Sequence, residues 1–230
     1  MVADFKANVD INKSQRESNY QFYNAVMRSL FGIVTYYSIN GVRHKFTFGY
    51  FSRVLDKSAN HAKACYLNLF NDNKDFSNLF PTIDGVPLFG GHIKEDTLWS
   101  LSDNGPTFKS NKWLNHVKVM AKLLNVDIDA KFLGPYHGKS DCDIYFGAWT
   151  KIIKDFRLSL DSNIMKRTTA SIVDYVNNRF AQHHFNTKPA TQRNGVTKRY
   201  KQSIVIYPTV ESFTRQALSD CAISEALLPY

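Results

Sequence analysis

Three aspartates stand where a chain of alternating strands and helices would bring side chains together. Asp4 lies in a strand-like stretch at the amino terminus, and Asp103 follows "LWSLS" at the start of a tight turn. Asp143 lies in the first turn of an expected helix. Converging carboxylates are the ligands that Mg²⁺ prefers, and two such ions can activate a nucleophile and stabilise the leaving oxygen of a phosphodiester. The three acids therefore predict a catalytic site that binds two Mg²⁺ or Mn²⁺ ions.

Each acid also has an ordinary structural interpretation. Ser140 and Asp143 have the spacing of a capping box, and the helix dipole favours an acid in a first helical turn. Asp103 in "DNGP" is a common turn residue, and Asp4 could be merely exposed near the terminus. The catalytic interpretation therefore depends on the three acids being placed together.

Asp143 is preferred to Asp141 as the third ligand because of the helix that follows. That helix is expected to bury apolar residues at steps of three and four. Asp143 lies three residues before the first of them and would continue this stripe toward the sheet, whereas Asp141 would point elsewhere. The stripe consists of Phe146, Trp149, Ile153 and Phe156.

Composition excludes several classes of protein. A chain of 230 residues can form one large domain, or one domain with a small appendage. An aromatic fraction of 14% argues against disorder. No apolar run approaches the length of a membrane span, and the amino terminus lacks the apolar block of a signal peptide. Three widely spaced cysteines predict a reducing, intracellular location without a disulfide framework.

Positive charge is concentrated late in the chain. Residues 144–202 hold 11 Lys or Arg against 3 acids, within a net charge of +9. This excess predicts a surface that follows nucleic-acid phosphates, and a solvated helix face with a basic tail is the alternative. The residues expected to contact DNA are Lys151, Lys154 and Arg157 on one helix face, and Arg193, Lys198, Arg199 and Lys201 in a basic loop.

Alternating strands and helices predict an α/β fold with helices packed on a mixed sheet. The pair Asn40-Gly41 is the strongest local signal and predicts a hairpin over 31–52. A surface insertion is expected at 71–95 and a basic loop at 187–200. Further strands are expected at 2–11, 97–102, 127–134 and 202–207, and helices at 19–31, 58–70, 112–124, 140–160, 168–184 and 212–228.

Three motifs together resemble the catalytic core of eukaryotic cut-and-paste DNA transposases. They are "ADFKANV", "LWSLSDNGPTFKS" and "GPYHGKSDCDIYFGAW", and the resemblance covers residues from about 2 to 160. It implies an RNase H-like core at 1–160, in which helices flank a mixed sheet. A mainly helical, basic extension would then occupy 161–230.

The resemblance also implies an activity, that of a DDE/D nuclease and strand transferase that cuts DNA with two Mg²⁺ or Mn²⁺ ions. Asp4, Asp103 and Asp143 would be the catalytic metal ligands. His137 and Lys139 would lie beside the scissile phosphate, and Lys109 would contact the DNA backbone nearby. The expected location is nuclear and the expected partner is DNA, with homo-oligomerisation left open and no membrane or small-molecule substrate expected.

One departure from the family keeps a second hypothesis open. Such transposases carry a sequence-specific DNA-binding domain before the first aspartate, and here only Met1 to Ala3 precede Asp4. The alternative is therefore a non-catalytic RNase H-like protein that binds nucleic acid or serves as an assembly component.

Overall fold

The computed structural model describes part of the chain, which divides into two compact units. The first unit comprises Met1–Ala3 and described residues of 56–138, and the second comprises those of 4–55 and 139–207. The division falls inside the first strand, between Ala3 and Asp4. The described residues are 1–11, 25–39, 42–70, 82–83, 86–87, 97–124, 126–134, 140–159, 168–182, 190–191 and 198–206.

The first unit contains three parallel strands in the order β8-β7-β1. Strand β7 (Thr97–Ser102) pairs along its whole length with β8 (Asp127–Phe132). On its other side, β7 pairs with the start of β1 (Val2–Phe5), Val2 opposite Leu101 and Ala3 opposite Ser102. A short antiparallel pair, β5 (Thr82–Ile83) and β6 (Val86–Pro87), lies apart from these strands.

Two helices build the core of the first unit, α2 (Ala59–Phe70) and α3 (Asn111–Leu124). The Trp113 ring of α3 lies 5.5 Å from the ring of Tyr66 on α2 and 5.1 Å from the ring of Phe108. Phe108 is buried and belongs to the turn that follows β7. Thr107 Oγ1 donates a 2.6 Å hydrogen bond to the Lys57 carbonyl. The core therefore anchors the turn that carries Asp103.

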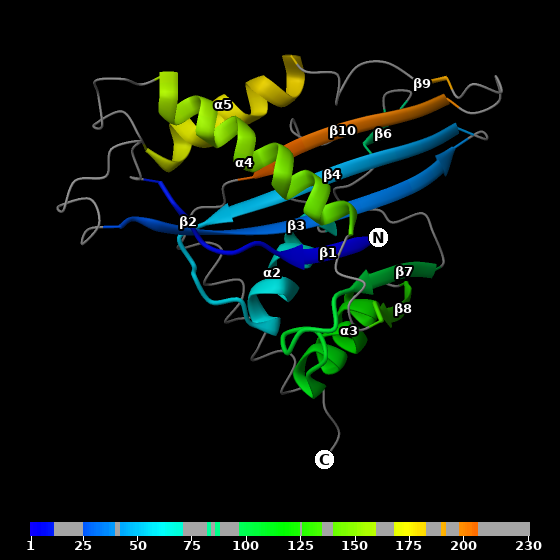
Figure 1. The fold of residues 1–230 in the computed structure, drawn as a ribbon. Coiled ribbons are helices and arrows are strands. Elements are labelled where there is room, and N and C mark those ends of the chain that lie inside the picture. The colour runs from blue at the N-terminus through cyan, green and yellow to red at the C-terminus, as the bar shows by residue number, and fades with distance from the viewer. Residues whose placement is uncertain are drawn as a thin grey trace. The chain divides into compact units, whose positions relative to one another are not determined.

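The second unit is built on the predicted hairpin of β3 (Met27–Ile39) and β4 (Val42–Ser52). The two strands pair antiparallel from Ser29–Ser52 to Ile39–Val42. The strand order is β1-β3-β4-β10-β9 with β2 also on β3, so the sheet mixes parallel and antiparallel pairs. Strands β2 (Val9–Asp10), β9 (Ala190–Thr191) and β10 (Lys198–Ile206) complete this unit (Figure 1).

Helices α4 (Asp141–Ser159) and α5 (Thr169–Gln182) lie over one face of the sheet of the second unit (Figure 1). Two glycines allow α4 to approach closely, because Gly32 and Gly49 are opposite each other in the β3–β4 register. A Cβ on Gly32 would lie 2.9 Å from the Phe146 ring, and one on Gly49 would clash with the Tyr145 hydroxyl. The amino-terminal half of α4 therefore packs directly against the backbone of β3 and β4 at these two glycines.

The predicted mixed α/β sheet flanked by helices is confirmed at this level of description. The structure also places an element at each remaining predicted strand, and at the helices predicted for 58–70, 112–124, 140–160 and 168–184. The helix predicted at 212–228 lies outside the described residues, as does most of the insertion at 71–95. Within the described residues, no helix combines the length and the apolar character that a membrane crossing requires.

Two predicted elements are wrong in part. The helix expected at 19–31 is a strand from Met27 onward, and its residues 19–24 lie outside the description. Leu30, Phe31, Ile33 and Val34 are fully buried in β3, so pairing and burial in a sheet overrode the helical spacing. The basic loop expected to extend to residue 200 ends earlier, because β10 begins at Lys198 and pairs in parallel with β4.

The division into units does not follow the boundary expected near residue 160. Helix α5 packs on α4, with the Phe156 and Tyr175 rings 4.9 Å apart. Strand β10 pairs with β4 over eight residues, from Arg199–Arg43 to Ile206–Tyr50. Both elements therefore belong to the second unit, and the described part of 161–230 includes a long strand of its sheet.

Candidate metal and nucleic-acid site

Asp4 and Asp103 each continue directly from a paired residue of the β1–β7 ladder. The paired residues are Ala3 and Ser102, which are both buried. Asp4 lies within β1, and Asp103 is the first residue after β7. The strands are parallel, and the carboxyl ends of parallel strands are where α/β sheets commonly bind ligands. The local register thus pairs the residues that precede the two acids, and the convergence of Asp4 and Asp103 on one metal site stays a prediction.

Asp103 has an unsatisfied carboxylate oxygen. Its Oδ1 atom is buried and accepts no hydrogen bond from the described residues. The carboxylate folds back over its own turn, so that a Cβ on Gly105 would lie 2.8 Å from Oδ2 and 3.2 Å from Oδ1. A buried acceptor without a donor is costly, and a bound cation would remove that cost. The role of Asp103 as a metal ligand stays a prediction, and its buried oxygen is one of several buried polar atoms without a partner among the described residues.

Asp4 faces the first turn of α4. Its Oδ1 accepts a 2.7 Å hydrogen bond from the Phe5 amide. Burial raises the pKa of the Cys142 thiol, and the Asp4 charge is the next largest cause of that increase, with smaller contributions from Asp143 and Asp141. The Cys142 thiol itself contacts the Gly32 carbonyl at 3.6 Å. Cys142 is thus a neutral, buried group among three carboxylates.

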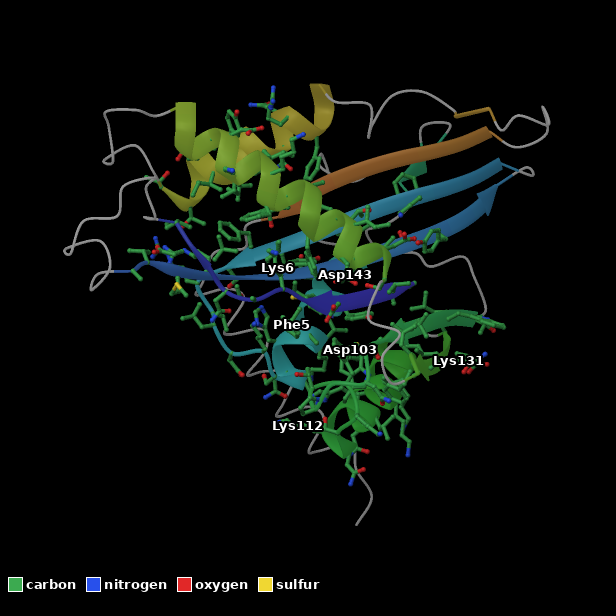
Figure 2. The ribbon with its side chains drawn as sticks, in the orientation of Figure 1. Phe5, Lys6, Asp103, Lys112, Lys131 and Asp143 are labelled. Carbon is green, nitrogen blue, oxygen red and sulfur yellow. The ribbon has the colours of Figure 1, made fainter. Side chains whose placement is uncertain are left out.

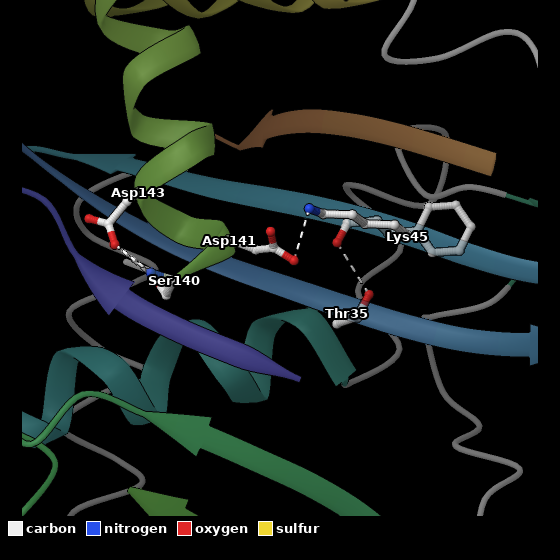
Figure 3. A network of polar contacts seen from close by, with 6 residues as sticks. Thr35, Lys45, Ser140, Asp141 and Asp143 are labelled. Carbon is white, nitrogen blue, oxygen red and sulfur yellow. Dashed lines mark hydrogen bonds and ion pairs between the residues drawn. The ribbon is translucent and has the colours of Figure 1, made fainter. Parts of the chain in front are cut away.

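Asp143 closes a capping box at the start of α4 (Figure 3). Its Oδ2 accepts hydrogen bonds from the Ser140 amide at 2.7 Å and from the Ser140 hydroxyl at 3.3 Å. The Asp143 amide donates to the Ser140 carbonyl at 3.0 Å. One half of the capping box, the Asp143 carboxylate on the Ser140 amide, is therefore present, while the Ser140 hydroxyl donates to that carboxylate instead of accepting from the Asp143 amide.

The predicted directions of Asp143 and Asp141 are wrong. Asp143 is exposed, whereas Asp141 is partly buried and forms a 3.0 Å ion pair with Lys45 of β4 (Figure 3). The buried position before Phe146 is taken by Cys142, which is fully buried and lies four residues earlier. An acid at the third helical position turns back toward the start of the helix. A step of three back from Phe146 therefore pointed to Asp143, whereas the buried residue is Cys142, four positions back.

The cap makes a measurable prediction. Ser140→Ala removes a hydroxyl that donates only a long, exposed hydrogen bond of 3.3 Å to Asp143 Oδ2, so it is expected to lower the free energy of unfolding by about 0.5 kcal/mol, the low end of the values for N-cap residues. Urea unfolding monitored by circular dichroism measures the change. Thr150→Ala provides a control within α4, since Thr150 Oγ1 donates only to the Phe146 carbonyl of the previous turn. Equal stability of Ser140→Ala and wild type would contradict a stabilising cap.

Of the other residues predicted to contact DNA, three are exposed, and the rest lack described side chains or lie outside the described residues. Lys109 is exposed in the turn after Asp103, where its amide donates to the Gly105 carbonyl at 3.0 Å. Lys151 and Lys154 are exposed on α4, while the predicted stripe of that helix is buried. Arg157 lies in α4, and Lys198, Arg199 and Lys201 lie in β10, without described side chains. His137, Lys139 and Arg193 lie outside the described residues.

The described acids only partly meet the requirements of a metal site. Across the described residues, no group of three or more His, Cys, Asp or Glu side chains is arranged to hold a metal ion. Asp4 and Asp103 supply the oxygen donors that Mg²⁺ accepts, and this ion commonly retains several water ligands. Asp143 and Asp141 already have protein partners, Ser140 and Lys45. Two acids therefore have the expected chemistry, and the third is committed to the helix cap.

Sequence reasoning missed two residues near Asp4. One is Cys142, and a helical period of four counted back from Phe146 would have found it. The other is Lys6, which lies two residues after Asp4 and therefore on the same side of an extended strand. The sequence matches no protein-family model, and no curated protein matches it significantly. Inference about function must therefore start from the site.

Proposed function

We propose that this protein is a metal-dependent nuclease and strand transferase that acts on DNA phosphodiesters through an RNase H-like core. The observation that carries the proposal is the parallel register of β1 and β7. Ala3 is opposite Ser102, so Asp4 and Asp103 continue from paired residues. The buried, unsatisfied Oδ1 of Asp103 supports a role in binding a cation.

The proposed site residues would have two roles, metal binding by aspartates and phosphate binding by lysines. Asp4 and Asp103 are the proposed ligands of the divalent ions, which would supply an activated nucleophile and charge stabilisation at a phosphodiester. Asp143 is the proposed third ligand, with Asp141 as the alternative. Either acid must exchange its present partner, Ser140 or Lys45, for the metal. The exposed Lys151 and Lys154 would hold the DNA backbone through its phosphates.

The commitment of the third acid favours a second candidate function. A capping box on Asp143 and an ion pair on Asp141 are both stable uses of these side chains without metal. An RNase H-like protein that binds nucleic acid without cleaving it would retain such contacts. Its basic residues would still bind phosphates, so the two candidates differ in catalysis and not in binding.

Nicking of supercoiled plasmid DNA by the purified chain tests the first candidate. We expect conversion to the open-circular form in Mg²⁺ or Mn²⁺ and none in EDTA. Asp103→Ala, prepared identically, controls for a contaminating nuclease. Retained DNA binding without metal-dependent nicking would support the non-catalytic candidate. Equal nicking by wild type and Asp103→Ala would show that the activity does not belong to this site.

A further inference from the structure

Lys6 shares one side of β1 with Asp4. Between them, Phe5 points to the other side and packs on Phe31 of β3, with 4.4 Å between ring centroids. Figure 2 shows Lys6 on the side of β1 that faces α4, with Phe5 opposite. The Lys6 amide donates to the Leu30 carbonyl at 2.9 Å, so the backbone at this position is held by β3.

The contacts of these two side chains on α4 match the geometry of a strand beside a helix. The Asp4 charge contributes to the raised pKa of the Cys142 thiol, and the Lys6 ammonium lies over the Phe146 ring, 5.7 Å from its centre. Cys142 and Phe146 are four residues apart and occupy the same face of the helix. Lys6, the residue directly after β1, therefore presents its ammonium to α4 at Phe146, and Asp4 lies two residues before it in the extended chain.

The Lys6 ammonium has an aromatic neighbour but no acidic partner among the described residues. Of the nearby acids, Asp141 pairs with Lys45 and Asp143 bonds to Ser140. Asp4 lies two residues away, yet it is not at ion-pair distance from Lys6. Lys6 is half-buried, and its ammonium is held on one side by Phe146. Its charge is thus positioned by the ring, and no acid of the described residues pairs with it.

We propose that Lys6 binds a non-bridging phosphate oxygen of a DNA strand that passes Asp4. The inference rests on the proposed function, because it takes the strand at Asp4 to be DNA. A lysine ammonium binds phosphate as a compact point charge. Since the ammonium already lies over the Phe146 ring, less rotamer freedom is lost on binding than for a fully exposed lysine.

The test measures DNA binding in EDTA, so that it does not depend on cleavage. The probe is a fluorescein-labelled DNA duplex, titrated at several salt concentrations. Lys6→Met keeps an unbranched side chain of similar length and removes the charge, while Lys6→Arg keeps the charge. Lys118→Met, on an exposed position of α3, is the matched control. Lys6→Gln replaces Lys6→Met if that variant does not fold.

We expect Lys6→Met to bind several-fold more weakly and to reduce the log–log salt slope by about 0.9, the value for one phosphate contact on duplex DNA. Lys6→Arg and Lys118→Met should retain the wild-type slope. A purely structural role would instead lower the melting temperature and leave the slope unchanged. An unchanged slope in Lys6→Met, equal losses in Lys6→Arg and Lys6→Met, or no DNA binding by wild type would each overturn the proposal.

These outcomes separate the inference from the proposed function. Metal-dependent nicking that requires Asp103, combined with an unchanged salt slope in Lys6→Met, would exclude Lys6 as a phosphate contact and would still support the proposed nuclease. A reduced slope without any nicking removes catalysis and retains Lys6 as a phosphate contact of a DNA-binding protein.

Discussion

Replacing Asp103 with Asn is expected to reduce Mg²⁺-dependent DNA nicking by about a thousandfold or more. Removing a metal ligand takes away several kcal/mol of charge stabilisation in the transition state. A loss of about 4 kcal/mol corresponds to three orders of magnitude in rate. Asparagine has nearly the same shape as aspartate, and Oδ1 of Asp103 is buried without a hydrogen bond among the described residues. The substitution should therefore preserve the fold, and removing an unsatisfied charge should not lower stability.

The rate of open-circle formation under single-turnover conditions measures this effect. Asp129→Asn is the matched control, because Asp129 is an acid of neighbouring β8 whose partner is Lys131, at 3.0 Å. Duplex binding in EDTA should be nearly unchanged in both variants. Mg²⁺ should raise the melting temperature of wild type and not that of Asp103→Asn, since binding to the folded state alone stabilises it. A rate for Asp103→Asn within tenfold of wild type would exclude Asp103 as a ligand.

Of the substitutions proposed for this protein, Gly49→Ala is expected to lower the free energy of unfolding the most. A Cβ there would clash with the Tyr145 hydroxyl and lie 3.0 Å from Cζ and 3.1 Å from Cε1 of the same ring. The ring cannot move easily, because it is buried and stacks on Phe180 at 5.7 Å. Overpacking of this kind costs about 1–3 kcal/mol and occasionally more, and we place Gly49→Ala near 3 kcal/mol. For a domain of this size, that corresponds to a decrease of about 6–12 °C in melting temperature.

Tyr145→Phe separates this clash from other effects. The Tyr145 hydroxyl is buried and has no hydrogen-bond partner among the described residues, so its removal should be neutral or slightly stabilising. When Tyr145→Phe is combined with Gly49→Ala, the ring lacks its hydroxyl, which is the closest clashing atom, and about half of the loss should be recovered. Gly147→Ala is the control, because a Cβ at Gly147 meets nothing within 4 Å, and it should stabilise α4 by up to about 1 kcal/mol. Equal melting temperatures for Gly49→Ala and wild type would contradict the close packing of α4 on the sheet.

Local features of this protein could be predicted from its sequence. The Asn40-Gly41 pair correctly predicted the β3–β4 hairpin, since a two-residue turn determines the register of its strands. The apolar spacing of 112–124 and 140–160 correctly predicted α3 and α4, because one face of each helix must be buried. The Ser140–Asp143 spacing was correctly identified as a capping box, although its alternative as a metal ligand was preferred.

Long-range pairing and close packing were decided only in the tertiary structure. The helical spacing around Val26 and Leu30 yielded to a strand, because β3 is buried and pairs with β1 on one side and with β4 on the other. Sequence spacing also could not reveal that β10 joins β4, since only the assembled sheet shows which edge remains open for it. At α4, Cys142 and Asp141 face the sheet and Asp143 faces solvent. That orientation depends on the approach of α4 over Gly32 and Gly49, and two glycines so far from the helix in sequence acquire this role only when the strands pair.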